Sequence, residues 1–237
     1  NTRGNLMKRL ILLILALGAL GLSQAFAIPK VTMQTFIAGA NGNYSAQPNA
    51  EFAYVLDNYV LGKSKTNEGW FGTFCLEKNE FFSPGQTYNV ALNDGSVMGG
   101  KGGNIVGGKD IISKGTAHLY QLFAMGTLAE LTYGASSSAK ELQDMFWYLE
   151  GEIGSIAATN PFIAPLTTKY TSLDNAKANY TGTAVGVMNL TGIRQDGSVT
   201  KNQDQLVFLG VPDGGMTLSL LGLSLVGMAA FRRRFNR

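Results

Sequence analysis

The chain has 237 residues, of which 15% are charged and 30 are glycine, and its formal net charge is +3. Charge content this low argues against a highly charged disordered chain, and glycines without a three-residue period exclude collagen. Between residues 28 and 211 there are 12 basic and 15 acidic residues, a net of −3, so the positive charge belongs to the ends. We therefore expect no basic face on the folded part of the chain, and no nucleic-acid partner.

The N-terminal segment, residues 1–27, is typical of an upstream extension followed by a secretory signal peptide. Two basic residues precede an apolar run at 10–22, which is shorter than the ~20 residues that a spanning helix needs. Ala25 and Ala27 form an Ala-x-Ala cleavage site. We expect export by the general export machinery with signal peptidase cutting after Ala27; an uncleaved N-terminal anchor is the alternative.

The first half of the segment 28–210 has the residue pattern of strands. The run 51–61 shows it best, because Phe52, Tyr54 and Leu56 alternate with residues of the opposite face. The strands predicted from such runs are 31–38, 51–61, 69–78 and 86–92. The glycine-rich stretch 98–108 is expected to be a loop.

The middle of the chain has the pattern of helices, one over 116–133 and a second from Ser138, which has capping-box spacing with Glu141. The second helix has an apolar face at helical spacing: Leu142, Met145, Phe146, Leu149 and Ile153. Strand character returns at 183–193 and 205–209. The order of strands, helices and strands predicts an α+β domain, a β-sandwich or barrel with a two-helix insertion.

The C-terminal segment 211–237 has three parts: a polar turn, an uncharged run of 16 residues at 216–231, and a basic end. The run would span about 24 Å as a helix, thin but tolerable for a bilayer. The positive-inside rule keeps the basic end in the cytoplasm. The turn consists of Val211, Pro212, Asp213, Gly214 and Gly215, and the basic end begins with Arg232, Arg233 and Arg234.

This three-part tail resembles the PEP-CTERM sorting signals of Gram-negative bacteria, in the variant that opens with Val-Pro-Asp. The chain has Gly214 where this variant often has serine. The resemblance implies an inner-membrane anchor that an exosortase-like membrane protease cuts, and delivery to the cell surface or extracellular matrix. The alternative is a plain tail anchor without processing.

The chain has one cysteine, Cys75, in the predicted strand 69–78. No internal disulfide is possible. In an exported chain, Cys75 is therefore either a small buried core residue or a reactive thiol.

Phe74-Cys75-Leu76 and the stretch from Gln143 to Trp147 together resemble the thioester domains of bacterial surface adhesins, over roughly residues 70–152. In that family a cysteine thiol attacks a glutamine carboxamide and expels ammonia, and an amine on a target later opens the thioester. The resemblance implies a bond between Cys75 and Gln143, with Trp147, one helical turn further on, shielding it. The chain differs from the family pattern at Leu142 and Met145, where a small or hydroxyl residue and an alanine are favoured.

Two other classes stay open. One is a structural or carbohydrate-binding β-domain of the matrix in which Cys75 is an unreactive core residue. The other is an exported cysteine hydrolase using Cys75 and the only histidine, His118, with Asn160 or Asn175 as the orienting group. A single histidine on a helix is more often structural, so we expect no enzyme.

No metal or cofactor site is predicted. One cysteine and one histidine make no zinc cluster. Asp144, Glu150 and Glu152 have the oxygen ligands that calcium prefers, but acids along a helix flank are usually solvated. The stretch 103–109 has nearly the spacing of a phosphate loop, yet Asp110 follows it and would repel phosphate.

Overall fold

The computed structural model describes residues 28–57, 66, 68–97, 105–106, 108–193 and 199–210. The predicted signal peptide and C-terminal tail lie outside these residues, as does most of the predicted glycine-rich loop. Within the described part of the chain, no helix is both long enough and apolar enough to cross a bilayer.

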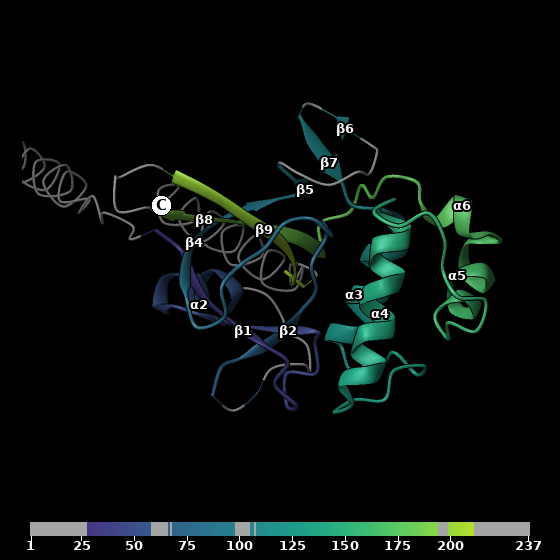
Figure 1. Cartoon of the computed structure of the whole chain (residues 1–237), viewed down its shortest axis with the longest axis horizontal. Coiled ribbons are helices and arrows are strands. Elements are labelled where there is room, and N and C mark those ends of the chain that lie inside the picture. The colour runs from purple at the N-terminus through teal and green to yellow at the C-terminus, as the bar shows by residue number, and fades with distance from the viewer. Residues whose placement is uncertain are drawn as a thin grey trace, which may run out of the picture.

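The main sheet has six antiparallel strands in the order β3-β2-β1-β4-β8-β9 (Figure 1). Their bounds are β1 (Lys30–Thr35), β2 (Tyr44–Pro48), β3 (Phe71–Thr73), β4 (Thr87–Asn93), β8 (Val185–Ile193) and β9 (Val199–Phe208). A second sheet has the order β5-β7-β6, with β5 (Gly95–Ser96), β6 (Ile105–Val106) and β7 (Lys109–Ile111).

The two edges of the main sheet are joined by the residues that follow β3. The amide of Leu76 donates to the carbonyl of Asp204 (3.1 Å), and the amide of Leu206 donates to that of Phe74 (3.0 Å). The segment 74–76 therefore pairs with β9 at the opposite edge, and the sheet closes on itself there. We call this junction between residues 74–76 and β9 the seam. Closure of this kind removes exposed edges, which otherwise invite pairing with other chains.

A buried tyrosine of α3 (Lys114–Ala124) contacts both joined edges. The hydroxyl of Tyr120, 1% exposed, lies 2.9 Å from the carbonyl oxygen of Gly72 and 3.1 Å from that of Leu206. Gly72 also lets α3 and the neighbouring backbone come close, because a Cβ there would lie 2.5 Å from Phe123 Cζ and 2.2 Å from the carbonyl oxygen of Ala40. The helix is thus fixed against the seam of the sheet.

Two hydrophobic cores lie on opposite faces of the main sheet, and alternation along β9 assigns its residues to them. Leu206 and Phe208 belong to the core under the helices, whereas Val207 belongs to the core that contains Phe52 of α2 (Ala50–Asp57). The larger core also contains the apolar faces of α3 and α4 (Ser136–Leu149), which lie side by side in Figure 1. The strand period of two explains this division.

The predicted strand 51–61 is wrong, because α2 occupies most of it. Asn49 caps the helix: its Oδ1 accepts from the amide of Phe52 (3.0 Å). Phe52 and Leu56, both fully buried, fit a strand as alternating residues and a helix as positions i and i+4. The cap decides between the two, and the sequence reading overlooked it.

The predicted helix 116–133 ends early, at Ala124. Ser113 caps the start of α3, where its Oγ accepts from the amide of Thr116 (3.1 Å). Gly126 has φ +67°, a conformation that ends helices and favours glycine. Leu128 and Leu131 continue the apolar pattern and are buried, but they lie in the non-helical connection between α3 and α4.

The second predicted helix exists but starts two residues earlier than Ser138. The capping box is not formed, because the Ser138 hydroxyl accepts from the amide of Thr132 (3.0 Å) instead. Two further helices, α5 (Ile163–Tyr170) and α6 (Leu173–Ala176), were not predicted, because Pro165 suggested a break whereas it lies within the first turn of α5. The predicted α+β class is confirmed.

Candidate functional site

Cys75 lies at the seam, directly opposite Gln205 of β9. The backbone bonds to β9 are made by the neighbours of this pair, so Cys75 turns its own amide and carbonyl away from β9. In such a pair the two side chains share one face and lie close together. Cys75 and Gln205 are both completely buried.

Gln143 of α4 hydrogen-bonds the backbone groups that Cys75 turns away from the sheet. Its Oε1 accepts from the Cys75 amide (2.9 Å) and its Nε2 donates to the Cys75 carbonyl (2.7 Å). The side chain is 0% exposed, so it is not the solvated residue that its place beside an apolar stripe suggested. The structure thus brings together the two residues that the sequence singled out, although 68 positions separate them.

The Cys75 sulfur has polar neighbours that the sequence analysis missed. The Nε2 of Gln205 donates to Sγ at 3.0 Å, and the hydroxyl of Tyr44 on β2 also hydrogen-bonds the thiol. Burial raises the pKa of Cys75 well above its ordinary value, while both hydrogen bonds act to lower it. Burial together with the neighbouring sulfur raises the pKa of Tyr44 to about 12. The pairing of 74–76 with β9 is the signal that would have identified Gln205.

Trp147 follows Gln143 by one turn of α4 and lines a surface pocket of about 400 Å³, which neither Cys75 nor Gln143 lines. The pocket also contains Lys78, whose ammonium nitrogen is 5.8 Å from the centre of the Trp147 ring, and the acids Glu141 and Asp144. The indole N–H is buried and has no hydrogen-bond partner among the described residues. Trp147 is half-buried, so it borders solvent on one side and the helix packing on the other.

Carboxyl groups gather next to the Cys75 segment. Glu77 is 2% exposed; its Oε1 accepts from the Ser96 hydroxyl, and its Oε2 has no hydrogen-bond partner within the described structure. Burial, and then repulsion from Glu152, Glu80 and Asp110, raises the pKa of Glu77 to about 8, although the Ser96 hydrogen bond opposes this. Two acids beside it behave in the same way: burial is the main cause that raises the pKa of Glu80 to about 7 and of Asp204 to about 6.

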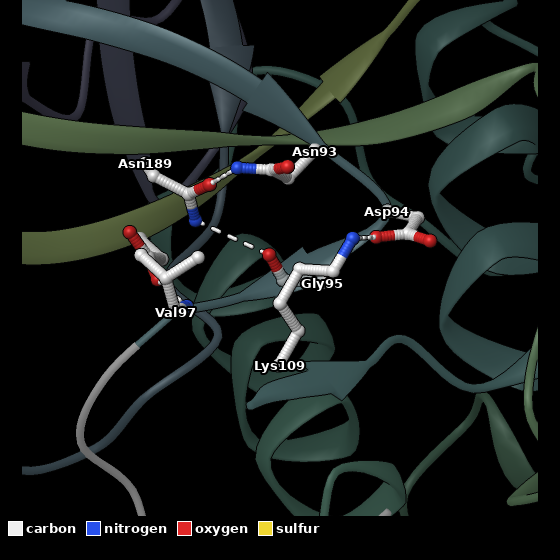
Figure 2. A network of polar contacts seen from close by, with 7 residues as sticks. Asn93, Asp94, Gly95, Val97, Lys109 and Asn189 are labelled. Atoms are coloured by element: carbon white, nitrogen blue, oxygen red, sulfur yellow. Dashed lines mark hydrogen bonds and ion pairs between the residues drawn. The ribbon is translucent and has the colours of Figure 1, made fainter. Parts of the chain in front are cut away.

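A polar network connects Asn189 and Asp204 to the second sheet and the residue that follows β5, and Figure 2 shows its part around Asn189. Asn189 of β8 accepts from the side chain of Asn93 and donates to the Gly95 carbonyl (3.2 Å). Asp204 accepts from the amide of Val97 (2.9 Å). Gly95 and Val97, which precede the glycine-rich stretch, are therefore fixed to β8 and β9.

The acids at the end of α4 are not simply solvated, as the sequence suggested. Glu152, 5% exposed, accepts from the amide of Lys78 (3.0 Å), and Glu150 accepts from the amide of Ser113 (3.1 Å). Burial raises the pKa of Glu150 to about 7. Both glutamates thus serve as backbone hydrogen-bond acceptors, and no group of three metal-ligating side chains occurs in the part of the chain that the structure covers.

The other residues of the hydrolase alternative make different contacts. His118 packs edge-on against Tyr170 of α5 (ring centres 6.0 Å apart), and burial, with Lys169 nearby, lowers its pKa to about 4. Asn160 and Asn175 hold backbone groups of Glu141, Phe162 and Tyr170. The hydrogen-bond partners found for the thiol are Gln205 and Tyr44.

Replacing Gln143 by leucine should destabilise the protein by about 2–4 kcal/mol, because the buried amide and carbonyl of Cys75 would lose their partners. The change is made in a Cys75→Ala background, so that no covalent chemistry contributes. Denaturant unfolding measures the effect. Gln121→Leu, on the half-exposed side of α3, is the control and should stay within about 0.5 kcal/mol. Equal stability of the two variants would contradict the importance of these bonds.

Comparison with known proteins gives one match. Residues 210–235 match the VPDSG-CTERM motif. Among curated proteins and among solved structures, nothing matches the chain. The matched segment coincides with the turn, apolar run and basic end of the sequence analysis, and the motif is a PEP-CTERM-like sorting signal. The chain therefore carries the signal of an exported protein that is processed at its C-terminal segment.

Proposed function

We propose that this exported protein forms an internal thioester between Cys75 Sγ and the carboxamide carbon of Gln143, and uses it to attach covalently to an amine-bearing target. The observation that carries the proposal is the pair of hydrogen bonds between the Gln143 carboxamide and the Cys75 backbone, in a completely buried site. These bonds fix an electrophile beside the only cysteine of the chain.

One hydrogen bond of the carboxamide suits the reaction. The Cys75 amide donates to Oε1, the oxygen on which negative charge grows when sulfur attacks the carbon, so it acts as an oxyanion donor. The sulfur–carbon bond forms, the carbon–nitrogen bond breaks, and the nitrogen leaves as ammonia with the thiol proton. Burial excludes the water that would hydrolyse the product.

In this scheme the target enters through the pocket that Trp147 lines, one helical turn from Gln143. A target amine attacks the thioester carbon, the carbon–sulfur bond breaks, and the proton lost by the amine passes to the sulfur, which leaves an amide to Gln143. Glu141, Asp144 and Lys78 line this pocket, and Asp144 is paired with Lys140 (3.3 Å), so charges of both signs border the approaching amine. Trp147 lies one helical turn from Gln143 and in this scheme shields the thioester from water.

The sorting signal supplies the setting. An exosortase-like membrane protease would cut the chain near Val211-Pro212-Asp213 after its C-terminal segment has anchored it in the inner membrane. The released domain would reach the cell surface or matrix of a Gram-negative bacterium. Attachment there is a single covalent event and not turnover, so we propose no enzymatic activity.

The test is the intact mass of the exported protein compared with that of Cys75→Ala processed in the same way. The mass of the wild type minus that of Cys75→Ala should equal the difference between the two side chains less the mass of one ammonia. Treatment with methylamine should add the mass of one methylamine to the wild type. Gln143→Ala should show neither change. A wild-type mass that differs from Cys75→Ala only by the side chain would end the proposal.

A second function is favoured by one observation: Cys75 is 0% exposed, as expected for an unreactive core residue. The protein would then be a structural or carbohydrate-binding domain of the matrix. This alternative predicts that Cys75→Ala leaves surface attachment unchanged, which fractionation of intact cells can measure.

A further inference from the structure

Two glutamines contact Cys75, and they do so differently. Gln143 hydrogen-bonds its backbone, whereas Gln205 donates from Nε2 directly to Sγ (3.0 Å). An amide that donates its N–H presents an edge of its plane to the sulfur. Nucleophilic attack needs the sulfur above the face of the carbonyl carbon. Gln205 is therefore placed as a hydrogen-bond donor and not as the acyl partner.

The register of the seam fixes this contact. Cys75 and Gln205 are a directly opposed pair whose side chains share one face, and both are completely buried. A buried amide keeps its hydrogen bond because breaking it leaves a polar group without water or partner. Gln205 thus holds the sulfur, while Gln143 of α4 binds the Cys75 backbone.

We propose, on the basis of the thioester function above, that Gln205 is a positioning residue whose Nε2–H holds the Cys75 sulfur and stabilises its thiolate. A thiolate is the nucleophile when the thioester forms and the leaving group when a target amine opens it. In the opening step the electron pair of the carbon–sulfur bond goes to sulfur. The Gln205 N–H holds that charge until the proton from the amine reaches it.

A second donor supports this role. The Tyr44 hydroxyl also hydrogen-bonds the thiol, and both contacts lower the pKa of Cys75 against the opposing effect of burial. Thiols with a lower pKa leave faster from a thioester or disulfide. The pair Tyr44 and Gln205 therefore offsets part of the cost of forming a charged sulfur in a completely buried place.

The test uses the full chain with Gln205→Met, which keeps the side-chain length and removes the donor. We expect methylamine to open the thioester about tenfold more slowly, as followed by mass. After opening, the thiolate absorbance near 240 nm should titrate about one pH unit higher than in wild type, with the Cys75→Ala signal subtracted. Gln203→Met is the matched control, because Gln203 is also a buried glutamine of β9 but donates to the Glu77 carbonyl.

Tyr44→Phe is the second variant, in case Gln205→Met does not fold, which thermal unfolding would reveal. It removes only a hydroxyl and should shift the thiolate titration in the same direction. A Gln205→Met protein that matches Gln203→Met in both measurements would overturn the proposal. So would loss of the ammonia signature in Gln205→Met with its retention in Gln143→Ala, because Gln205 would then be the acyl partner.

The outcomes separate this proposal from the thioester itself. If wild type shows no loss of ammonia, the thioester function fails, and the thiolate titration of the free cysteine still tests the donor role of Gln205. If the ammonia is lost and the titration does not move, the thioester stands and the positioning role is wrong.

Discussion

Replacing Glu77 by glutamine should stabilise the protein by about 2–4 kcal/mol at pH 8 and change its stability little at pH 5. The pKa of Glu77 is raised to about 8 in the folded chain, chiefly by burial. The folded state therefore keeps a proton that the unfolded state releases above about pH 4.5. Between these two values the folded state binds more protons, so stability is present at low pH and is lost as the pH rises.

Denaturant unfolding at both pH values measures this effect. Glu68→Gln is the control, because Glu68 is exposed and the same substitution there should change the free energy of unfolding by less than about 0.5 kcal/mol. The comparison between variants is needed because His118 acts in the opposite direction: its pKa is lowered to about 4, so acidification from pH 6.5 favours the unfolded state. That contribution is common to wild type and variant. Equal stabilisation at both pH values would show that Glu77 is ionised throughout.

Replacing Phe74 by alanine should cost about 3–5 kcal/mol, the largest loss expected from a single core truncation. Phe74 is completely buried, and its ring centre lies 5.0 Å from those of both Phe123 on α3 and Phe146 on α4. Both contacts are edge-to-face, an arrangement that adds to the energy of burial. The truncation leaves a cavity where the two helices meet the segment 74–76, which contains Cys75.

Phe81→Ala is the matched control. Phe81 is 78% exposed, so the same truncation should change the free energy of unfolding by less than about 0.5 kcal/mol. A small effect of Phe74→Ala would mean that the helices do not depend on this ring for their position. If the large effect is found, hydrogen exchange at the Cys75 amide should also rise, because Gln143 is held by the same helix.

The sequence predicted the strands that alternate cleanly and the two helices with an apolar face, and it failed where a local cap or turn decided the outcome. Strands β4 and β8 fall within two residues of the predicted 86–92 and 183–193. The predicted strand at 51–61 is a helix because Asn49 caps it, and periodicity alone does not separate the two for such a short run. The strands β2 and β5 lack a strong apolar pattern and were not predicted.

The candidate site was predicted in part. Cys75 and Gln143 were singled out by residue type and motif, and the structure brings them into contact. Gln205 and Tyr44 were missed because their relation to Cys75 depends on which strands meet at the seam, and no local pattern contains that information. The buried acids were missed for a related reason: a glutamate in sequence looks solvated unless its burial is known.

The seam also determines how the domain responds to mechanical load. β9 ends at Phe208, two residues before the segment that matches the sorting motif, so a pull on that segment reaches β9 first for as long as the segment remains attached. That strand is hydrogen-bonded to β8 on one side and to residues 74–76 on the other. Under the proposed function, a covalent link at Gln143 would hold the other end of this load. β9 would then have to separate from both of its neighbours before the attachment point at Gln143 moves.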